Sequence, residues 1–164
     1  MWRRPSGVGH AAPVSVRMDR DEAMQRVAAA HTGIVTSLRR DGVPLSTPMW
    51  FCVVDDAVHF RTPATSKKAA RLRNDPRIGF LVEGGERWAQ LWAVHLAGRA
   101  EFVDDDDVIA RVGEALTAKY STFRTPRTEM PDDTRTHYER PFVVVRIAAE
   151  ERIVSWDNTK LGLE

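Results

Sequence analysis

The sequence predicts a mainly β, α+β domain: a six-stranded antiparallel split β-barrel flanked by helices. Short segments rich in β-branched and apolar residues alternate with turn residues along most of the chain. Asp41-Gly42 and Asp55-Asp56 each separate two such segments, which indicates two consecutive hairpins and therefore an antiparallel meander. Helical spacing follows the third and the fifth strand. An open α+β sheet fits the same pattern, which by itself does not separate the two architectures.

Each predicted element has a local reason. Asp19 can cap a first helix over Arg20 to Ala30, where apolar residues recur at helical spacing. A second helix starts after Ser66 and stops at Asn74-Asp75-Pro76, because the residue before a proline is pushed out of helical geometry. A third follows the acidic run Asp104 to Asp107, which suits the positive end of a helix dipole. The expected strands cover residues 34–38, 43–54, 57–61, 78–82, 88–103 and 142–147, with a loop over 121–133 and a short helical piece leading to residue 139.

Length and composition limit the possible functions. The 164 residues suffice for one domain, expected at 19–164 after a flexible leader at 1–18 that lacks the apolar core of a signal peptide. The 24 Lys and Arg residues nearly balance 23 Asp and Glu residues, which argues against a nucleic-acid surface. No apolar run approaches the roughly 20 residues of a membrane span. We therefore expect a cytoplasmic protein with neither nucleic acid nor membrane as a partner.

Common catalytic and metal-binding motifs are missing from the sequence. The single cysteine, Cys52, excludes an internal disulfide and any multi-cysteine metal site. The five histidines show no close metal-ligand spacing, so we predict no metal site. GxGxxG, Walker and GxSxG sequences are also missing. The chemistry of this chain must therefore come from another kind of site.

The basic stretch from His59 to Asn74 is the first candidate. Ser66 can cap the helix that follows, and free backbone amides at a helix start favour an anion. Lys67 and Lys68 lie at this same end, where cations oppose the helix dipole, and Arg61 precedes the turn. A bound phosphate would resolve this conflict. A solvated basic turn is the alternative interpretation.

Tryptophans mark a second candidate region. Trp50 lies in the second predicted strand, after Thr47-Pro48-Met49, and this strand is expected to pair with the one that carries Arg61. Trp92 lies in the fifth strand and Trp156 in the tail. Aromatic side chains of this number are mostly core or interface residues, but they could also line a slot for a planar ring.

Three segments, taken in their order along the chain, together resemble one protein family. They read TPMWF, FRTPATSKKAARLRNDPRIGFLVE and LAGRAEFVDD. The sequence from Asp19 to Leu163 is similar to the FMN-binding split-barrel proteins of the pyridoxamine 5′-phosphate oxidase superfamily. Within it, the sequence most resembles the actinobacterial branch of flavin/deazaflavin oxidoreductases that use coenzyme F420, and the ending SWDNTKLGL matches a tail found in part of that branch.

This resemblance implies a homodimer with two cofactor sites at the subunit interface. It implies that the phosphate of F420 or FMN is held at the Ser66 turn, that one strand backs the ring, and that the fifth strand and the tail approach from the partner subunit. The implied residues are, for the phosphate, Arg61, Thr62, Ser66, Lys67 and Lys68; for the ring, Pro48, Met49 and Trp50; and from the partner, Trp92, Trp156 and Lys160.

Two departures from the family pattern refine the functional hypothesis. The arginine–histidine substrate signature of true pyridoxamine-phosphate oxidases is missing, which argues against vitamin B6 oxidation, and Ser-Lys-Lys replaces the Ser-Arg-Lys common among FMN users. The leading hypothesis is an F420H2-dependent reductase of a small electron-poor acceptor. An FMN-binding oxidoreductase and a non-catalytic F420 or flavin carrier are the alternatives. No residue stands out as the catalytic proton source; solvent, Tyr120 and His137 stay open, and the 121–133 loop is expected to shape substrate access.

Overall fold

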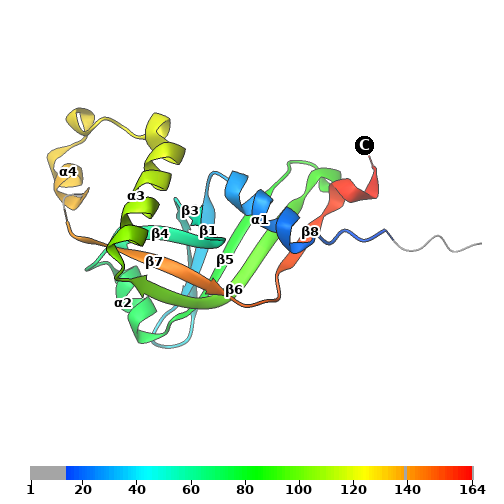
Figure 1. Ribbon diagram of the computed structural model, residues 1–164, viewed down its shortest axis with the longest axis horizontal. Coiled ribbons are helices and arrows are strands. Elements are labelled where there is room, and N and C mark those ends of the chain that lie inside the picture. Colours follow the sequence, from blue (N-terminus) through cyan, green and yellow to red (C-terminus); the bar gives the residue numbers. More distant parts are fainter. Residues whose placement is uncertain (1–13, 139, 164) are drawn as a thin grey trace, which may run out of the picture.

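The structure is a computed structural model that describes residues 14–138 and 140–163 (Figure 1). A single curled antiparallel sheet forms its centre, with helices packed against it. The strand order is β2-β1-β5-β6-β7-β4-β3, and β8 pairs with β6 beside this path. This curled antiparallel sheet with flanking helices confirms the predicted fold class, a mainly β, α+β split barrel flanked by helices.

The bounds of the elements follow the turn and capping signals closely. The strands are β1 (Gly33–Leu38), β2 (Pro44–Met49), β3 (Cys52–Val54), β4 (Ala57–Pro63), β5 (Arg77–Gly84), β6 (Trp92–Val103), β7 (Phe142–Ala149) and β8 (Val154–Asp157). The α-helices are α1 (Arg20–Ala29), α2 (Lys67–Asn74), α3 (Asp106–Tyr120) and α4 (Asp132–Tyr138). Short 3-10 turns cover η1 (Trp88–Gln90), η2 (Ser121–Phe123), η3 (Arg127–Glu129) and η4 (Asn158–Leu161).

The predicted second strand is wrong in one important respect. Residues 43–54 form two strands, because the chain breaks at Trp50 and Phe51 and crosses from one edge of the sheet to the other. β2 pairs with β1, whereas β3 pairs with β4. The two hairpins therefore do not form one continuous meander, and Trp50 does not lie in a strand paired with that of Arg61. Sequence periodicity cannot reveal such a break, because both halves keep an extended pattern.

Other differences concern the number of strands and the predicted loops. The described residues contain eight strands instead of six, through this break and through β8 in the tail. Residues 88–90 form a 3-10 turn before β6 begins at Trp92. The predicted loop over 121–133 contains two 3-10 turns, and α4 begins at its end. Residues 121–138 form an arm that extends from the end of α3 and carries α4, on the left in Figure 1.

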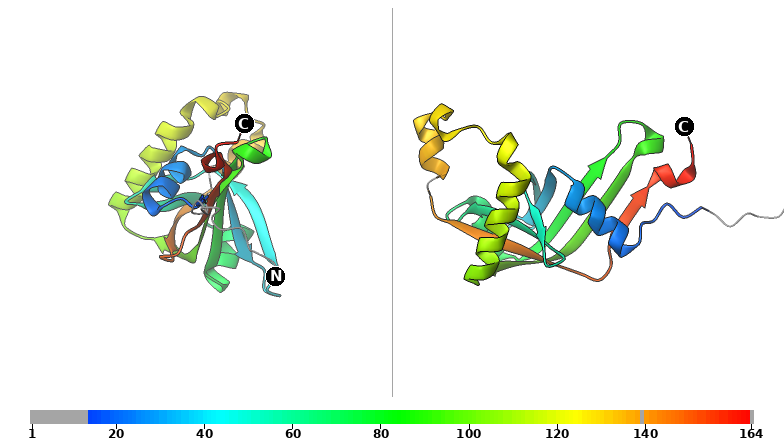
Figure 2. Two further views of the ribbon diagram at one scale, coloured as in Figure 1. Left: turned by 90° about the vertical axis from the view of Figure 1, so that its right-hand side faces the viewer. Right: turned by 45° about the horizontal axis from the view of Figure 1, so that its top comes forward.

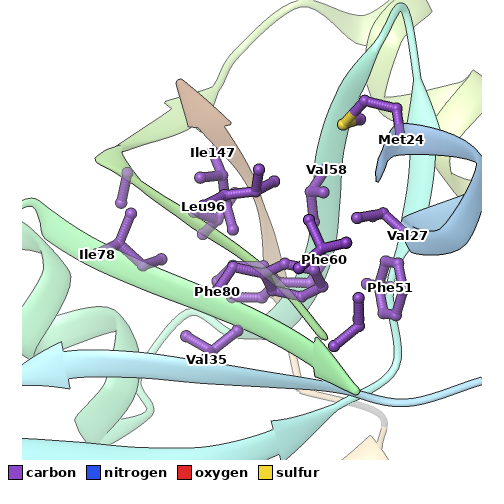
Figure 3. Packing of buried hydrophobic residues seen from close by; sticks show 14 of the residues in the cluster. Met24, Val27, Val35, Phe51, Val58, Phe60, Ile78, Phe80, Leu96 and Ile147 are labelled. Atoms are coloured by element: carbon purple, nitrogen blue, oxygen red, sulfur yellow. The ribbon is translucent and has the colours of Figure 1, made fainter. Parts of the chain in front are cut away.

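Two apolar clusters hold the domain together. In the larger one, α1 packs Met24 and Val27 against the concave face of the sheet, around Phe51, Phe60 and Phe80 (Figure 3). In the smaller one, α3 packs Val112, Leu116 and Tyr120 against Cys52 and Val144, which point to the opposite face of β3 and β7. The sheet is therefore covered on its concave face by α1 and on part of its convex face by α3.

The tail closes back onto the N-terminal helix, near the C-terminus in both views of Figure 2. Ser155 exchanges hydrogen bonds with the backbone of Met18, and the buried Asp157 carboxylate accepts a hydrogen bond from Arg26 at 2.7 Å. Of the expected flexible leader, residues 1–13 lie outside the described residues, and Met18 is buried. None of the helices in the described part of the chain is long and apolar enough to cross a membrane.

Candidate cofactor-binding site

The turn before α2 is built as the sequence predicts. Ser66 caps the helix, since its hydroxyl accepts a hydrogen bond from the backbone N–H of Ala69 at 3.1 Å. The same hydroxyl lies 3.0 Å from that of Thr62, at the buried end of β4. Lys67, the first residue of the helix, is exposed. The helix start therefore presents two hydroxyls and an exposed cation.

Lys68 turns inward from this helix start. Its ammonium nitrogen contacts the thioether sulfur of Met49, at the end of β2, and lies 5.9 Å from the ring centroid of Phe60. Burial, with a contribution from the nearby charge of Arg71, lowers the pKa of Lys68 to about 8. A cation held against a thioether and an aromatic ring is poorly compensated. An anion at this position would stabilise it.

A second unsatisfied polar group lies on the same strand. Thr47 is two residues before Met49 and points to the same, concave face of β2. Its hydroxyl oxygen is buried and has no hydrogen-bond partner among the described residues. Arg71 reaches across from α2 and donates a hydrogen bond to the Ser37 hydroxyl at 2.9 Å. The concave side of β1 and β2 under α2 thus contains cations and an unused hydroxyl.

None of the basic residues of α2 forms an ion pair with a described carboxylate. The helix has four of them, Lys67, Lys68, Arg71 and Arg73, and no acidic residue in its first turn. Elsewhere in the described structure, arginines such as Arg77 and Arg111 are paired with aspartates at 2.6–2.7 Å. The positive charge at α2 is therefore available to an external anion.

Arg61 does not join Thr62 and Lys68 on the concave face. Successive residues of a strand point to opposite faces, so Arg61 lies on the convex side, beside α3. Its guanidinium carbon lies 3.1 Å from the ring centroid of Phe142. Burial lowers its pKa, and the charge of Arg124 lowers it further. Arg61 lines an open groove of about 610 Å³ whose other wall consists of Ala110, Gly113, Glu114, Thr117 and Ala118 of α3.

Trp50 and its neighbours form an aromatic surface at the crossover between β2 and β3. The indole lies parallel to the ring of Tyr120, with 4.4 Å between centroids and 4° between planes. His31 meets Trp50, Tyr120 and Phe123 edge-on, at 6.2, 5.3 and 4.5 Å. Trp50 follows Met49 directly in the chain, although Met49 packs with the core on the concave face and Tyr120 belongs to the α3 cluster. Pro48, in contrast, is exposed on the convex face opposite Ile34.

The three residues expected from the fifth strand and the tail lie at the start of β6, in β8 and in η4. The start of β6 pairs with β8, which lies near the C-terminus in Figure 1. Trp92 packs on Gly84, where an added Cβ would come within 2.6 Å of the indole nitrogen, and under the guanidinium of Arg26. Lys160 forms an ion pair with Glu22 at 2.6 Å. Trp156 is 40% exposed on the convex face. Within one chain, none of the three meets the Ser66 turn.

Of the two side chains left open as proton sources, the structure describes Tyr120. Tyr120 is fully buried, and its hydroxyl accepts the backbone N–H of Phe51 at 3.1 Å and lies within hydrogen-bond distance of the carbonyls of His31 and Phe51. The Tyr120 hydroxyl is therefore already hydrogen-bonded to backbone groups, both as an acceptor and as a donor. The side chain of His137 lies outside the described residues. Among the described residues no cluster of His, Cys, Asp and Glu suits a metal ion.

Sequence reasoning did not select Thr47, Arg71, Arg124, His31 or Phe123. Alternation along β2 could have placed Thr47 beside Met49, and the i, i+3 spacing could have placed Arg71 beside Lys68. The contact of His31 with Trp50 and Phe123 depends on the crossover at residues 50–51, for which the sequence has no signal.

The fold and this site correspond to one protein family. The family model described as pyridoxamine 5′-phosphate oxidase matches residues 20–154. The chain therefore belongs to the pyridoxamine 5′-phosphate oxidase family, as its resemblance implied.

Individual relatives agree with this assignment. The chain is 31% identical over 156 residues to the uncharacterised protein Rv0080 of Mycobacterium tuberculosis, covering 89% of this chain and 97% of that protein. The crystal structure of the conserved hypothetical protein Rv2991 of M. tuberculosis is similar with a TM-score of 0.76 and 34% identity, over 94% of both chains. An FAD-binding protein of Mycobacterium smegmatis shares the fold, with a TM-score of 0.60 and 19% identity over 84% of this chain and 95% of that one.

The residues present fit a phosphate-bearing cofactor with a planar ring. A helix N-terminus, unpaired cations and an unsatisfied buried hydroxyl suit the phosphate and the polar chain attached to it. The indole of Trp50, held by its stack on Tyr120, suits a planar ring. These are binding features, because the described residues near them include no nucleophile activated by a neighbouring base.

Proposed function

We propose that the protein is an F420H2-dependent reductase that transfers a hydride to a small electron-poor acceptor. The observation that carries the proposal is the contact between Lys68 and Met49, which joins the cationic start of α2 to the strand that leads into Trp50. A phosphate at the first position and a ring at the second match the two ends of a deazaflavin cofactor. The Ser-Lys-Lys turn and the SWDNTKLGL tail favour F420 over FMN.

The residues of this chain would bind and orient both reactants. Ser66, Lys67 and Lys68 would hold the phosphate, with Thr62 positioning the Ser66 hydroxyl, and Arg61 would approach from the convex side. Met49 and Trp50 would back the ring, next to Pro48. When bound, the reduced deazaflavin supplies the hydride. Tyr120 keeps Trp50 in place through ring stacking, and solvent supplies the proton.

We also propose that the protein is a homodimer. The convex face of β1, β5, β6 and β8 bears half-buried Ile34, Leu81 and His95 beside exposed Val154 and Trp156. The helix contacts of β1 and β6 lie on the concave side, through Arg71 of α2 and Met24 and Val27 of α1. An apolar sheet face of this kind is normally covered. Pairing of two such faces would let Trp156, with Trp92 and Lys160 behind it, approach the partner's site.

Binding titrations of the cofactor-free protein with F420 and FMN test the cofactor proposal. We expect F420 to bind more tightly than FMN and Lys68→Met to weaken binding of F420 roughly 10- to 100-fold, as for loss of a charged hydrogen bond. Arg40→Met, an exposed arginine of the β1–β2 turn, is the matched control and should leave affinity unchanged. Equal affinities of all three proteins for F420 would refute the site.

Turnover then separates the alternatives. F420H2 oxidation in the presence of a conjugated enone identifies a reductase, whereas tight F420 binding without turnover across a panel of enones identifies a carrier. A yellow protein on purification, with FMN bound more tightly than F420, identifies the FMN-dependent alternative. The FAD-binding relative in M. smegmatis shares the fold with this chain, which is why flavin binding must be measured beside F420 binding.

A further inference from the structure

The aromatic surface of His31, Trp50 and Phe123 consists of three exposed rings. Phe123 is 60% exposed and belongs to η2, at the start of the arm that follows α3, whereas Trp50 is 38% exposed at the β2–β3 crossover. His31, itself exposed, contacts both rings. Three exposed rings from three distant segments of the sequence therefore form one continuous surface.

This surface is preformed. The stack of Trp50 on Tyr120 covers one face of the indole, so the exposed part of Trp50 must be its opposite face and edges. Tyr120 cannot move with it, because its hydroxyl is bound to the backbone of Phe51 and to the carbonyl of His31. Large rings held in place this way lose little entropy when a ligand binds.

The neighbours of the surface indicate the kind of ligand. Trp50, which the proposed function places against the cofactor ring, belongs to this surface, so an acceptor lying on the surface would lie beside that ring. Arg124 follows Phe123 and is close enough to Arg61 to affect its pKa. A ligand lying on the three rings would therefore have its planar apolar part on the protein and its polar end towards cationic side chains.

We propose that His31, Trp50 and Phe123 form the acceptor subsite and select enones that carry an aromatic ring. The inference rests on the proposed function and names its substrate class. In the reaction, the acceptor gains a hydride from the reduced cofactor at its β-carbon and a proton from solvent at its α-carbon. The carbon–carbon double bond is reduced to a single bond while the cofactor is oxidised by two electrons. Phe123 acts as a specificity residue and takes no part in proton transfer.

Benzylideneacetone and ethylideneacetone test the proposal, since these enones differ only by a phenyl group in place of a methyl group. We expect the cofactor-free protein to bind benzylideneacetone more tightly in ligand-observed NMR. Phe123→Ala should weaken this binding roughly two- to tenfold, the value of one aromatic pair, and leave ethylideneacetone and F420 binding unchanged. Trp88→Ala, which removes a 62% exposed indole at η1, is the matched control and should have no effect.

Two measurements keep this inference separate from the proposed function. If benzylideneacetone binding depends on Phe123 but F420H2 supports no turnover, the aromatic subsite stands and the reductase proposal fails. If Phe123→Ala and Trp88→Ala both bind benzylideneacetone as the unaltered protein does, the subsite is overturned, whatever the turnover. Trp50→Phe, which keeps a ring at the crossover, should retain most of the binding of benzylideneacetone. A double variant, Trp50→Ala with Phe123→Ala, that still binds benzylideneacetone as the unaltered protein does would also overturn the subsite.

Discussion

The hydroxyl of Tyr120 accepts the backbone N–H of Phe51 at 3.1 Å and thereby ties the end of α3 to the crossover between the two edges of the sheet. The crossover carries Trp50 on one side and the core residue Phe51 on the other. One side chain thus positions the candidate ring-binding surface and closes the core beneath it.

Tyr120→Phe should therefore destabilise the fold while preserving the aromatic stack. The change leaves the Phe51 N–H and one carbonyl, that of His31 or of Phe51, short of a partner, so we expect a loss of about 1–3 kcal/mol in the free energy of unfolding. Urea denaturation measures it. Phe123→Ala, in an exposed ring of the same cluster, should change stability by less than about 0.5 kcal/mol. Equal losses would show that the hydroxyl has no special role.

Lys68 should make cofactor binding depend on pH. Its pKa of about 8 in the free protein means that the ammonium is lost as pH rises through about 8, and an anion then loses its partner. We expect the affinity for F420 to fall above about pH 8, and the fall to begin at higher pH in Lys68→Arg, because a guanidinium stays charged. Isothermal titration calorimetry from pH 6 to about 10 tests this. Identical profiles for the two proteins would contradict a role for Lys68 in charge recognition.

The same pKa has a consequence for stability. The folded-state pKa of Lys68 lies below the unfolded value of 10.5, so the unfolded chain holds more protons between about 8 and 10.5. This group therefore makes the protein more stable as pH rises through that window, the reverse of its effect on binding.

Leu81→Lys should separate the proposed dimer into folded monomers. Leu81 lies at the middle of the convex face, between Ile34 of β1 and His95 of β6. An added charge there would be desolvated on both sides of a two-fold interface. Light scattering coupled to size exclusion gives the mass, and circular dichroism confirms the fold. Val43→Lys, at an exposed turn, should stay dimeric. A monomeric unaltered protein would refute the dimer outright.

His59 should make the fold sensitive to acid. It is buried, its Nδ1 lies 3.0 Å from the Ala57 carbonyl, and its Nε2 has no partner among the described residues. Burial lowers its pKa below 6.5; Arg146 of β7 and Arg111 of α3 lower it further, while the Ala57 carbonyl and Asp55 oppose the shift. Between the lowered pKa and 6.5 the unfolded chain binds the proton more readily, so stability falls as pH falls.

We expect the free energy of unfolding to decrease by up to about 1.4 kcal/mol per pH unit in that window. His59→Leu should flatten this part of the profile. His31→Gln, at an exposed histidine, should leave it in place. Urea midpoints between pH 5 and about 7 decide the matter, and a His59→Leu profile parallel to that of the unaltered protein would contradict the assignment.

Asp56→Gly should stabilise the β3–β4 hairpin. Asp55 and Asp56 have φ values of 49° and 59°, in the left-handed region that the second position of such a turn usually fills with glycine. We expect a gain of about 0.5–1 kcal/mol in the free energy of unfolding. Asp41→Gly in the other hairpin should instead destabilise, because Asp41 accepts a hydrogen bond from Val43 and pairs with Arg39. Thermal denaturation of the two variants should give shifts of opposite sign.

Much of the fold was predictable because its signals are local. The Ser66 cap, the stop before Pro76 and the acidic start of α3 each depend on a few neighbouring residues, and all three helix boundaries appear where expected. β8 was missed because its four residues, Val154–Asp157, form a strand only by pairing with β6. The break at residues 50–51 was missed because it requires the opposite edge of the sheet as a partner.

By itself, the sequence determined the α+β class, the starts of α1, α2 and α3, and the place where cations gather at the helix N-terminus of Ser66. These features arise from backbone sterics, capping and charge within one or two turns of chain. Only the tertiary structure decided which of those cations share a site. The strand pleat sends Arg61 to the convex side and Thr62 to the concave side, and the crossover brings Trp50 onto Tyr120, seventy residues later in the chain. The first depends on β4 extending to Pro63, beyond the predicted end of the strand at residue 61. The second depends on packing between distant segments, for which residue patterns along the chain have no signal.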